Sequence, residues 1–205
     1  DYKMKRLVES FRDWGRDCWC QTGMNNTCGK RYSWKLGKLP KGYDHKFVYS
    51  HVGYNMKITD MQAALGCSQL DKVDTFIEKR KNNFTYLMKR FLEEKLDKYF
   101  ILPEAHPKAE PSWYGFLLTI KNNKKINRND LVSHLNTRRV LTRLLFAGNL
   151  TKQPGYMNKK HKIIGNLKNT DKIMCDTFWV GVWPGLDTIQ LDYIVDEIKK
   201  YILKI

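Results

Sequence analysis

Residues 59–93 read TDMQAALGCSQLDKVDTFIEKRKNNFTYLMKRFLE, and this segment organises the rest of the chain. The Thr59-x-x-Gln62 pair at its start has the form of a capping box, in which two side chains satisfy free backbone groups of the first helical turn. Apolar residues then recur at spacings that suit one helix to about residue 93. They are Met61, Ala64, Leu65, Leu70, Val73, Phe76, Ile77, Phe84, Leu87 and Phe91. A helix of that length predicts a bridge between two domains.

Downstream of this helix, three short segments have the composition of strands. Residues 113–120 follow Pro111 and are rich in aromatic and aliphatic residues. Residues 140–145 form a second short run of this kind. Residues 178–183 are interpreted as a strand or a buried turn.

Three helices are expected between and after these strands. Asn127 and Thr170 are placed to cap two of them, and Thr188 opens the third. Their apolar residues are Leu131, Val132 and Leu135 in the first, Met174 in the second, and Leu191, Ile194, Val195, Ile198 and Ile202 in the third. Because helices and strands alternate, the predicted fold class is α/β or α+β.

Upstream, the sequence predicts a helix followed by a long loop. Met4, Leu7, Val8 and Phe11 mark one helical face with neither an initiator Met nor an N-cap before it, so we expect the chain to begin inside a larger protein. Residues 15–57 are rich in Gly, Pro, Asn, Tyr and Trp and lack a sustained period. A loop of that length in a compact domain is usually functional, so something should hold it in place.

The composition is that of a globular protein with a basic surface. Hydrophobic residues make up 42% of the chain, and no segment resembles a membrane helix or a signal peptide, so we expect a cytoplasmic protein without a membrane partner. The formal net charge of +16 raises nucleic acid, an anionic membrane or a phosphorylated ligand as partners. Because the Lys residues are scattered and no nucleic-acid-binding signature accompanies them, we favour a solvated basic surface and expect no nucleic-acid partner.

The sharpest chemical signal is the spacing of three cysteines in the loop, Cys18-x-Cys20-x7-Cys28. Two thiolates one residue apart can converge on one centre, and Gly23 with its Asn neighbours lets the backbone turn to bring in the third. Soft thiolates at this spacing favour an iron–sulfur cluster or zinc, and the spacing does not choose between them. Three ordinary reduced thiols are the alternative, since disulfides are rare in the cytoplasm.

A fourth ligand is missing from this part of the sequence. Cys67 and Cys175 stand among apolar residues of expected helices, so we interpret both as buried core thiols. His45 and His51 are possible ligands, although loop histidines more often have no such role.

Several strings of this sequence, taken together, resemble one protein family. They are SFRDWGRDCWC (10–20), NTCGKR (26–31), GYDHK (42–46), SHVGYNMKITDMQAA (50–64), PSWYGF (111–116), TRLLFAGNL (142–150), NTD (169–171) and FWVGVWPG (178–185). Over essentially the whole chain they resemble the DegT/DnrJ/EryC1/StrS aminotransferase family, most closely its 3-dehydrases for CDP-linked 4-keto-6-deoxyhexoses in lipopolysaccharide biosynthesis. The resemblance implies the C-terminal part of a fold-type-I, pyridoxal-phosphate-dependent enzyme. Residues 1–57 would end the large cofactor domain, and residues 58–205 would form the bridging helix and a small α+β domain.

The resemblance also implies a cofactor chemistry. Pyridoxamine or pyridoxal 5′-phosphate would act as electron sink while the sugar C3 hydroxyl is removed. Electrons would arrive through a [2Fe–2S] cluster from an NADH-dependent iron–sulfur flavoprotein reductase. In the family, a Cys-x-Cys-x7-Cys set, matched here by Cys18, Cys20 and Cys28, and one Cys far upstream bind the cluster. The catalytic groups, including a His in place of the usual Schiff-base Lys, would lie before residue 1, so this chain alone is expected to be inactive.

Four further residues are candidates on the basis of the resemblance. Asn55 of the Gly-Tyr-Asn motif would reach across a homodimer interface to the cofactor phosphate of the other subunit, or would simply shape a turn. Lys57, where relatives often have Arg, would bind a phosphate or carboxylate of the substrate, or be an exposed loop residue. Tyr114 stands where the family tends to have Phe near the cofactor. Arg143 suits a diphosphate clamp, with a structural ion pair as the alternative.

Two other functions remain open from the sequence. A cluster-free nucleotide-sugar dehydratase or aminotransferase would keep the pyridoxal-phosphate fold, although neither chemistry needs thiolates at these positions. A basic metal-binding module that contacts nucleic acid would account for the charge and the cysteines. Strongly salt-dependent binding to DNA or RNA would favour the second.

Overall fold

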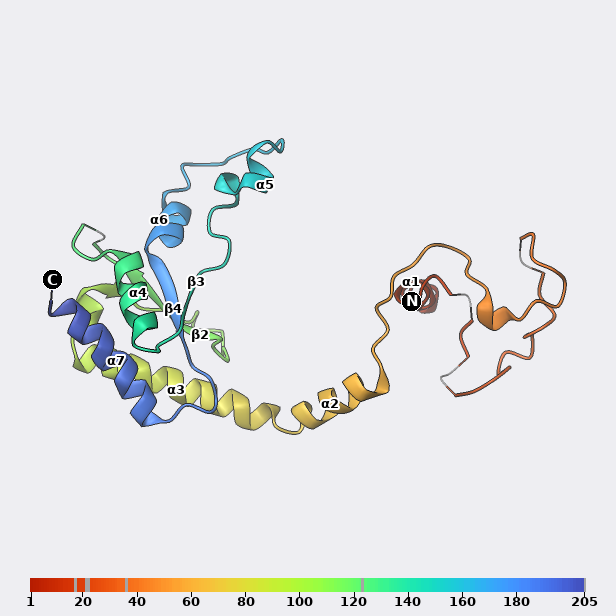
Figure 1. Ribbon diagram of the computed structural model, residues 1–205, viewed down its shortest axis with the longest axis horizontal. Coiled ribbons are helices and arrows are strands. Elements are labelled where there is room, and N and C mark those ends of the chain that lie inside the picture. The colour runs from red at the N-terminus through yellow and green to blue at the C-terminus, as the bar shows by residue number, and fades with distance from the viewer. Residues whose placement is uncertain (17, 21–22, 36, 123, 205) are drawn as a thin grey trace. The chain divides into compact units, whose positions relative to one another are not determined.

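The computed structural model describes residues 1–16, 18–20, 23–35, 37–122 and 124–204. Asp17, in one of the motifs quoted above, lies outside these ranges. The chain divides into two compact units, unit 1 (Asp1–Leu70) and unit 2 (Asp71–Ile205), each of which is described by itself (Figure 1). Both helices and strands are present, as the predicted fold class requires.

Unit 2 is built on a four-stranded antiparallel sheet with the order β1-β2-β4-β3 (Figure 1). The strands are β1 (Phe100–Ile101), β2 (Gly115–Ile120), β3 (Thr142–Leu144) and β4 (Thr177–Gly181). β2 alternates half-buried and buried residues, because successive side chains of a strand point to opposite faces. The residues predicted as three strands therefore form β2, β3 and β4.

Helices cover the buried face of this sheet. They include α3 (Val73–Glu93), α4 (Arg128–Thr137) and α7 (Thr188–Ile202), of which α3 and α7 pack against each other. α6 (Lys168–Asp176) leads directly into β4, and the short helices of unit 2 are η2 (Leu96–Lys98), η3 (Leu150–Lys152) and α5 (Pro154–Met157). Arg90 of α3 donates from Nε to the Asp192 carboxylate of α7 at 2.7 Å, which fixes the register of the two helices.

The predicted helix starts are confirmed at two of three places. Asn127 caps α4 by accepting hydrogen bonds from the backbone N–H groups of Asn129 and Asp130. α7 begins at Thr188, with Asp187 as the capping residue. The prediction for Thr170 was wrong, because α6 begins at Lys168, before the expected cap.

A single core holds unit 2 together. Phe116 of β2 is fully buried, with ring centroids 5.1 Å from Phe84 and 5.0 Å from Phe91, both on α3. The apolar residues predicted for α4 and α7 line the same cluster, with Val132 at its edge. Burial of this apolar surface is the main source of stability for a domain of this size.

The predicted helix over residues 59–93 was wrong in its continuity. The Thr59–Gln62 capping box is present, with hydrogen bonds of 2.8 and 3.3 Å, but α2 (Asp60–Leu70) ends at Leu70 and α3 begins at Val73. α2 buries none of its residues, and Met61 is 82% exposed. α2 therefore has no packed face that would stabilise a continuous helix through Asp71 and Lys72.

Unit 1 contains α1 (Tyr2–Arg12), the short helix η1 (His45–Phe47) and α2. Contrary to the expectation of a helix without an N-cap, the Asp1 side chain accepts from the backbone N–H of Lys3. η1 is the one helix in the described part of residues 15–57, so this segment is a loop, as the sequence predicted. No helix in the described ranges of the chain is long and apolar enough to cross a membrane.

Replacing Phe116 with Ala should lower the free energy of unfolding by about 3–5 kcal/mol, since it leaves a cavity between β2 and α3. The matched control is Phe146→Ala, because Phe146 is 80% exposed, and it should change that free energy by less than about 0.5 kcal/mol. Urea unfolding followed by circular dichroism measures both. Equal effects of the two substitutions would contradict the assigned core.

Candidate functional site

The site in unit 1 begins where two backbone segments meet. The N–H of Tyr54 donates to the carbonyl of Phe11 at 2.7 Å, and the N–H of Trp14 donates to the carbonyl of Tyr54 at 3.0 Å. Isolated bridges join Asp13 to Asn55 and Arg16 to Tyr49. The end of α1 and the segment before α2 are therefore fixed against each other, although they are about 40 residues apart in the sequence.

Two glycines make this contact possible. A Cβ atom at Gly15 would lie 1.9 Å from the carbonyl oxygen of His51, and one at Gly53 would lie 2.2 Å from the backbone nitrogen of Gly15. Gly15 also has a φ of +83°, which an L side chain rarely adopts. Both motif glycines are thus explained by close backbone approach.

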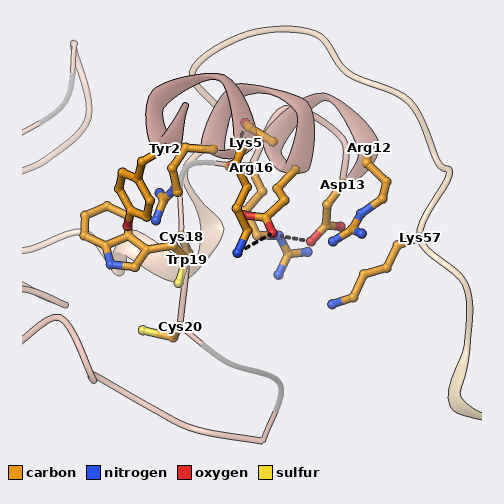
Figure 2. Close-up of a pocket in the computed structure, with 12 residues that line it drawn as sticks. Tyr2, Lys5, Arg12, Asp13, Arg16, Cys18, Trp19, Cys20 and Lys57 are labelled. Atoms are coloured by element: carbon orange, nitrogen blue, oxygen red, sulfur yellow. Dashed lines mark hydrogen bonds and ion pairs between the residues drawn. The ribbon is translucent and has the colours of Figure 1, made fainter.

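A cleft of about 430 Å³ lies beside α1, and we call it the cationic cleft (Figure 2). Its charged lining is Lys5, Arg6, Glu9, Arg12, Asp13, Arg16 and Lys57. The carboxylates of Glu9 and Asp13 pair with Lys5 and Arg16, at 3.9 and 3.7 Å. Among the described residues, Arg12 and Lys57 make no ion pair, so the cleft keeps unneutralised positive charge that suits an anionic ligand.

The structure places two of the predicted site residues at this contact. The backbone of Asn55 is held in the bridge to Asp13, while its exposed side chain forms no hydrogen bond with any described residue. Lys57 is exposed and extends into the cationic cleft from the returning segment (Figure 2). Neither side chain is therefore used for local structure within the described ranges.

The three clustered cysteines line one narrow cavity of about 10 Å³, which we call the thiol cavity. Met24, Asn25, Asn26, Arg31, His45 and Lys46 complete its lining. Within the described residues, no three Cys, His, Asp or Glu side chains are gathered so that they could hold a single metal ion. A two-iron cluster divides its ligands between two irons, so its cysteines need not converge on one point. The thiol cavity therefore supplies soft sulfur donors of the type that iron–sulfur clusters use, without a preformed site for a single metal ion among the described residues.

The thiols of the cavity differ in their electrostatics. A hydrogen bond from the Thr27 side chain, with further hydrogen bonds from the Cys28 and Thr27 backbone and the Cys18 thiol, lowers the pKa of Cys20 to about 6. Burial raises the pKa of Cys18, and repulsion by Cys20 and Cys28 adds to the rise. Cys28 Sγ accepts from the backbone N–H of Lys30 at 3.4 Å. At neutral pH, Cys20 is therefore mostly a thiolate, which is the form that binds metal.

Arg31 belongs to this site and was not identified from the sequence. Its Nε and Nη2 donate to the Asp44 carboxylate at 3.0 and 2.7 Å, and this pairing holds the pKa of Asp44 below its usual range. The pair joins the segment after Cys28 to the segment before His45. The sequence offered one signal for Arg31, because it directly follows Cys28-Gly29-Lys30 and Arg is the residue best suited to bidentate pairing with a carboxylate.

Two other candidate residues lie in unit 2. Tyr114 is 67% exposed, and its ring meets the ring of Trp179 edge-on at 5.1 Å. Arg143 is opposite Trp179 in the β3–β4 ladder and donates to the carbonyl of Thr142 at 3.0 Å. It makes no ion pair with the residues that are described, so the structural ion pair considered as its alternative role is not seen.

The interpretation of Cys67 and Cys175 as core residues was wrong. Both thiols are exposed. Cys67 lies on α2, which buries no residue, and in α6 Asp176 rather than its neighbour Cys175 is buried. Apolar neighbours in the sequence did not indicate which face of either helix is covered.

Comparison with known proteins gives one family. The sequence profile of the DegT/DnrJ/EryC1/StrS aminotransferase family matches residues 30–199. The chain is 52% identical over 199 residues to the lipopolysaccharide biosynthesis protein RfbH of Salmonella typhimurium, covering 97% of the chain and 45% of that protein. It is 46% identical over 204 residues to the dTDP-4-dehydro-2,6-dideoxy-D-glucose 3-dehydratase of Saccharopolyspora spinosa, covering 98% of the chain and 43% of that protein. The chain thus spans a little under half the length of these relatives.

A solved structure has the same fold. The E. coli GDP-4-keto-6-deoxy-D-mannose-3-dehydratase, with bound hydrated PLP, matches with a TM-score of 0.73 over 97% of this chain and 48% of that chain, at 23% sequence identity. The predicted fold, part of a pyridoxal-phosphate-dependent transferase, is therefore confirmed.

The lowered pKa of Cys20 predicts how the metal-free chain reacts with iodoacetamide. The alkylation rate of Cys20 should rise with pH through about 6 and level off near neutral pH, because the thiolate is the nucleophile. Thr27→Val removes the main stabilising hydrogen bond and should move this midpoint upward by about one pH unit or more. Peptide mass spectrometry measures the rate, with the surface substitution Thr75→Val as control. A midpoint that is the same in Thr27→Val and the unsubstituted chain would contradict the assigned hydrogen bond.

Proposed function

Because this chain belongs to the DegT/DnrJ/EryC1/StrS aminotransferase family, we propose that it supplies the C-terminal part of a nucleotide-sugar 3-dehydrase. The whole enzyme would remove the C3 hydroxyl of a CDP-linked 4-keto-6-deoxyhexose in deoxysugar and lipopolysaccharide biosynthesis. The relatives that support this are a lipopolysaccharide biosynthesis protein and a 3-dehydratase, at 52% and 46% identity. When bound, pyridoxamine phosphate would supply the electron sink and a [2Fe–2S] cluster would supply the electrons.

The observation that carries the proposal is that Cys18, Cys20 and Cys28 all line the thiol cavity. Three thiols from a loop without repetitive structure share one small space, beside the cation Arg31. A sugar dehydratase or aminotransferase that works without a cluster has no chemical use for such a group. We assign the three side chains as cluster ligands, with the fourth ligand supplied from outside this chain.

The role of Asn55 follows from its free side chain. Its backbone is fixed by the bridge to Asp13, and its side-chain amide is exposed. An amide N–H₂ donates well to a phosphate oxygen. We assign Asn55 to the cofactor phosphate of the other subunit, which requires the enzyme to act as a homodimer.

Charged residues of this chain suit a diphosphate-linked sugar. Lys57 and Arg12 carry positive charge in the cationic cleft without a carboxylate partner among the described residues, and we assign Lys57 to substrate binding. In unit 2 we assign Arg143 and Tyr114 to the substrate as well, since both present exposed polar groups beside Trp179. The electron donor of the whole enzyme would be an NADH-dependent iron–sulfur flavoprotein reductase.

The cluster assignment predicts the metal content of the whole protein that carries this chain. Purified without oxygen, it should contain about two irons and two acid-labile sulfides per chain, and Cys20→Ser should lose most of both. The matched control is Cys67→Ser, because Cys67 is exposed on α2, and this variant should keep the full content. Iron and sulfide analysis with visible absorption measures the result. Zinc, or no metal, in the unsubstituted protein would favour the cluster-free dehydratase or aminotransferase.

The assignment of Asn55 predicts a weaker cofactor complex. Asn55→Ala removes a hydrogen bond to a charged group, which contributes about 1.5–3 kcal/mol, so the dissociation constant of pyridoxal phosphate should rise about 10-fold to 100-fold. Absorption titration of the whole protein measures the constant, and Asn82→Ala on the exposed side of α3 is the control. An unchanged constant in a variant with normal circular dichroism would remove Asn55 from the cofactor site.

A further inference from the structure

His45 is the one buried polar residue in the described part of the loop over residues 15–57. Its side chain is 1% exposed, and its Nε2 atom has no hydrogen-bond partner among the residues that the structure describes. A buried polar atom without a partner is rare in folded proteins, because its lost contact with water is not replaced. In a loop whose other polar residues mostly reach solvent, this burial calls for a reason.

The backbone of His45 is fixed from two directions. The Asp44 side chain caps the short helix η1 by accepting from the N–H of Lys46 at 3.0 Å, and it also forms the bidentate ion pair with Arg31. The N–H of His45 donates to the carbonyl of Arg31 at 2.9 Å. His45 is therefore attached to the same segment that follows Cys28.

Two tryptophans enclose the imidazole. The ring of Trp34 lies 4.2 Å from that of His45, centroid to centroid, and the ring of Trp19 meets it edge-on at 5.4 Å. Trp19 is in turn covered by the guanidinium of Arg6 at 4.2 Å. These rings keep water from the imidazole and offer it no strong hydrogen-bond acceptor.

His45 also lines the thiol cavity, together with Cys18, Cys20 and Cys28. Sulfur of a thiolate or a bound sulfide accepts hydrogen bonds, and such bonds are one of the ways in which proteins set the potential of iron–sulfur groups. We propose that the Nε2–H of His45 donates a hydrogen bond to the sulfur-containing cluster held by these cysteines. This role lets His45 tune the reduction potential of the electron-transferring cluster, and it rests on the proposed function.

The direction of the effect follows from charge. One-electron reduction adds negative charge to the cluster, and a hydrogen-bond donor stabilises the more negative form more strongly. His45 should therefore raise the reduction potential of the cluster. Its removal should lower the potential without removing iron, because the thiolates remain as ligands.

The test compares three variants of the whole protein, purified without oxygen. His45→Phe keeps a ring between the two tryptophans but has no donor, and it should keep its iron and sulfide while its midpoint potential shifts to a lower value. His45→Gln places an amide N–H₂ at about the reach of imidazole Nε2, and it should restore part of the shift. The matched control is His51→Phe, which changes another histidine of the loop, outside the thiol cavity, and should leave the potential unchanged. Redox titration followed by visible absorption and electron paramagnetic resonance measures all of them.

The outcomes separate the two proposals. Equal potentials for His45→Phe and the unsubstituted protein, with iron present in both, would overturn the role of His45 and leave the proposed function standing. Loss of iron from both His45 variants, with normal circular dichroism, would also overturn it, because His45 would then be a ligand and not a donor. An unsubstituted protein without iron would overturn the proposed function and this inference together.

Discussion

The arrangement of unit 1 depends on the backbone contact between Gly15 and Gly53. Since any Cβ atom at either position would overlap backbone atoms of the other segment, the two segments can meet only if both residues are glycine. The chain leaves this contact on one side toward Cys18 and the thiol cavity, and on the other toward Asn55 and Lys57. One of these segments carries the residues assigned to the cluster, and the other carries those assigned to the cofactor phosphate and the substrate. Both segments therefore start from the same backbone contact.

The two units are stabilised by different kinds of interaction. Unit 2 has a continuous apolar core, whereas Val48 is the one buried hydrophobic residue in the described part of unit 1. The loop that carries the three cysteines is thus held by directional contacts. They are the Arg31–Asp44 ion pair, the hydrogen bond from the His45 N–H to the Arg31 carbonyl, and the rings around His45. Such contacts are individually weak near the surface. A ligand that binds the thiols would add stability to the loop, because metal binding and local folding are coupled in sites of this kind.

Local signals in the sequence predicted much of this structure. The Thr59–Gln62 capping box, the Asn127 cap and the aromatic and aliphatic composition of residues 113–120 act within a few residues, so they could be identified directly. The failures concern burial. The end of α2 at Leu70 and the exposure of Cys67 depend on which helix face finds a partner, and sequence spacing does not contain that information.

The candidate site shows the same division between local and distant information. Spacing alone indicated Cys18, Cys20 and Cys28 as a group, but the pairing of Arg31 with Asp44 and the burial of His45 arise between segments that are far apart in sequence. These distant contacts also determine the charge of the site. Burial, with added repulsion from Cys20 and Cys28, raises the pKa of Cys18, while hydrogen bonds, chiefly from the Thr27 side chain, lower that of Cys20. Arg31 and Lys46 also line the cavity, and positive metal ions bound to the thiolates would offset the repulsion among them.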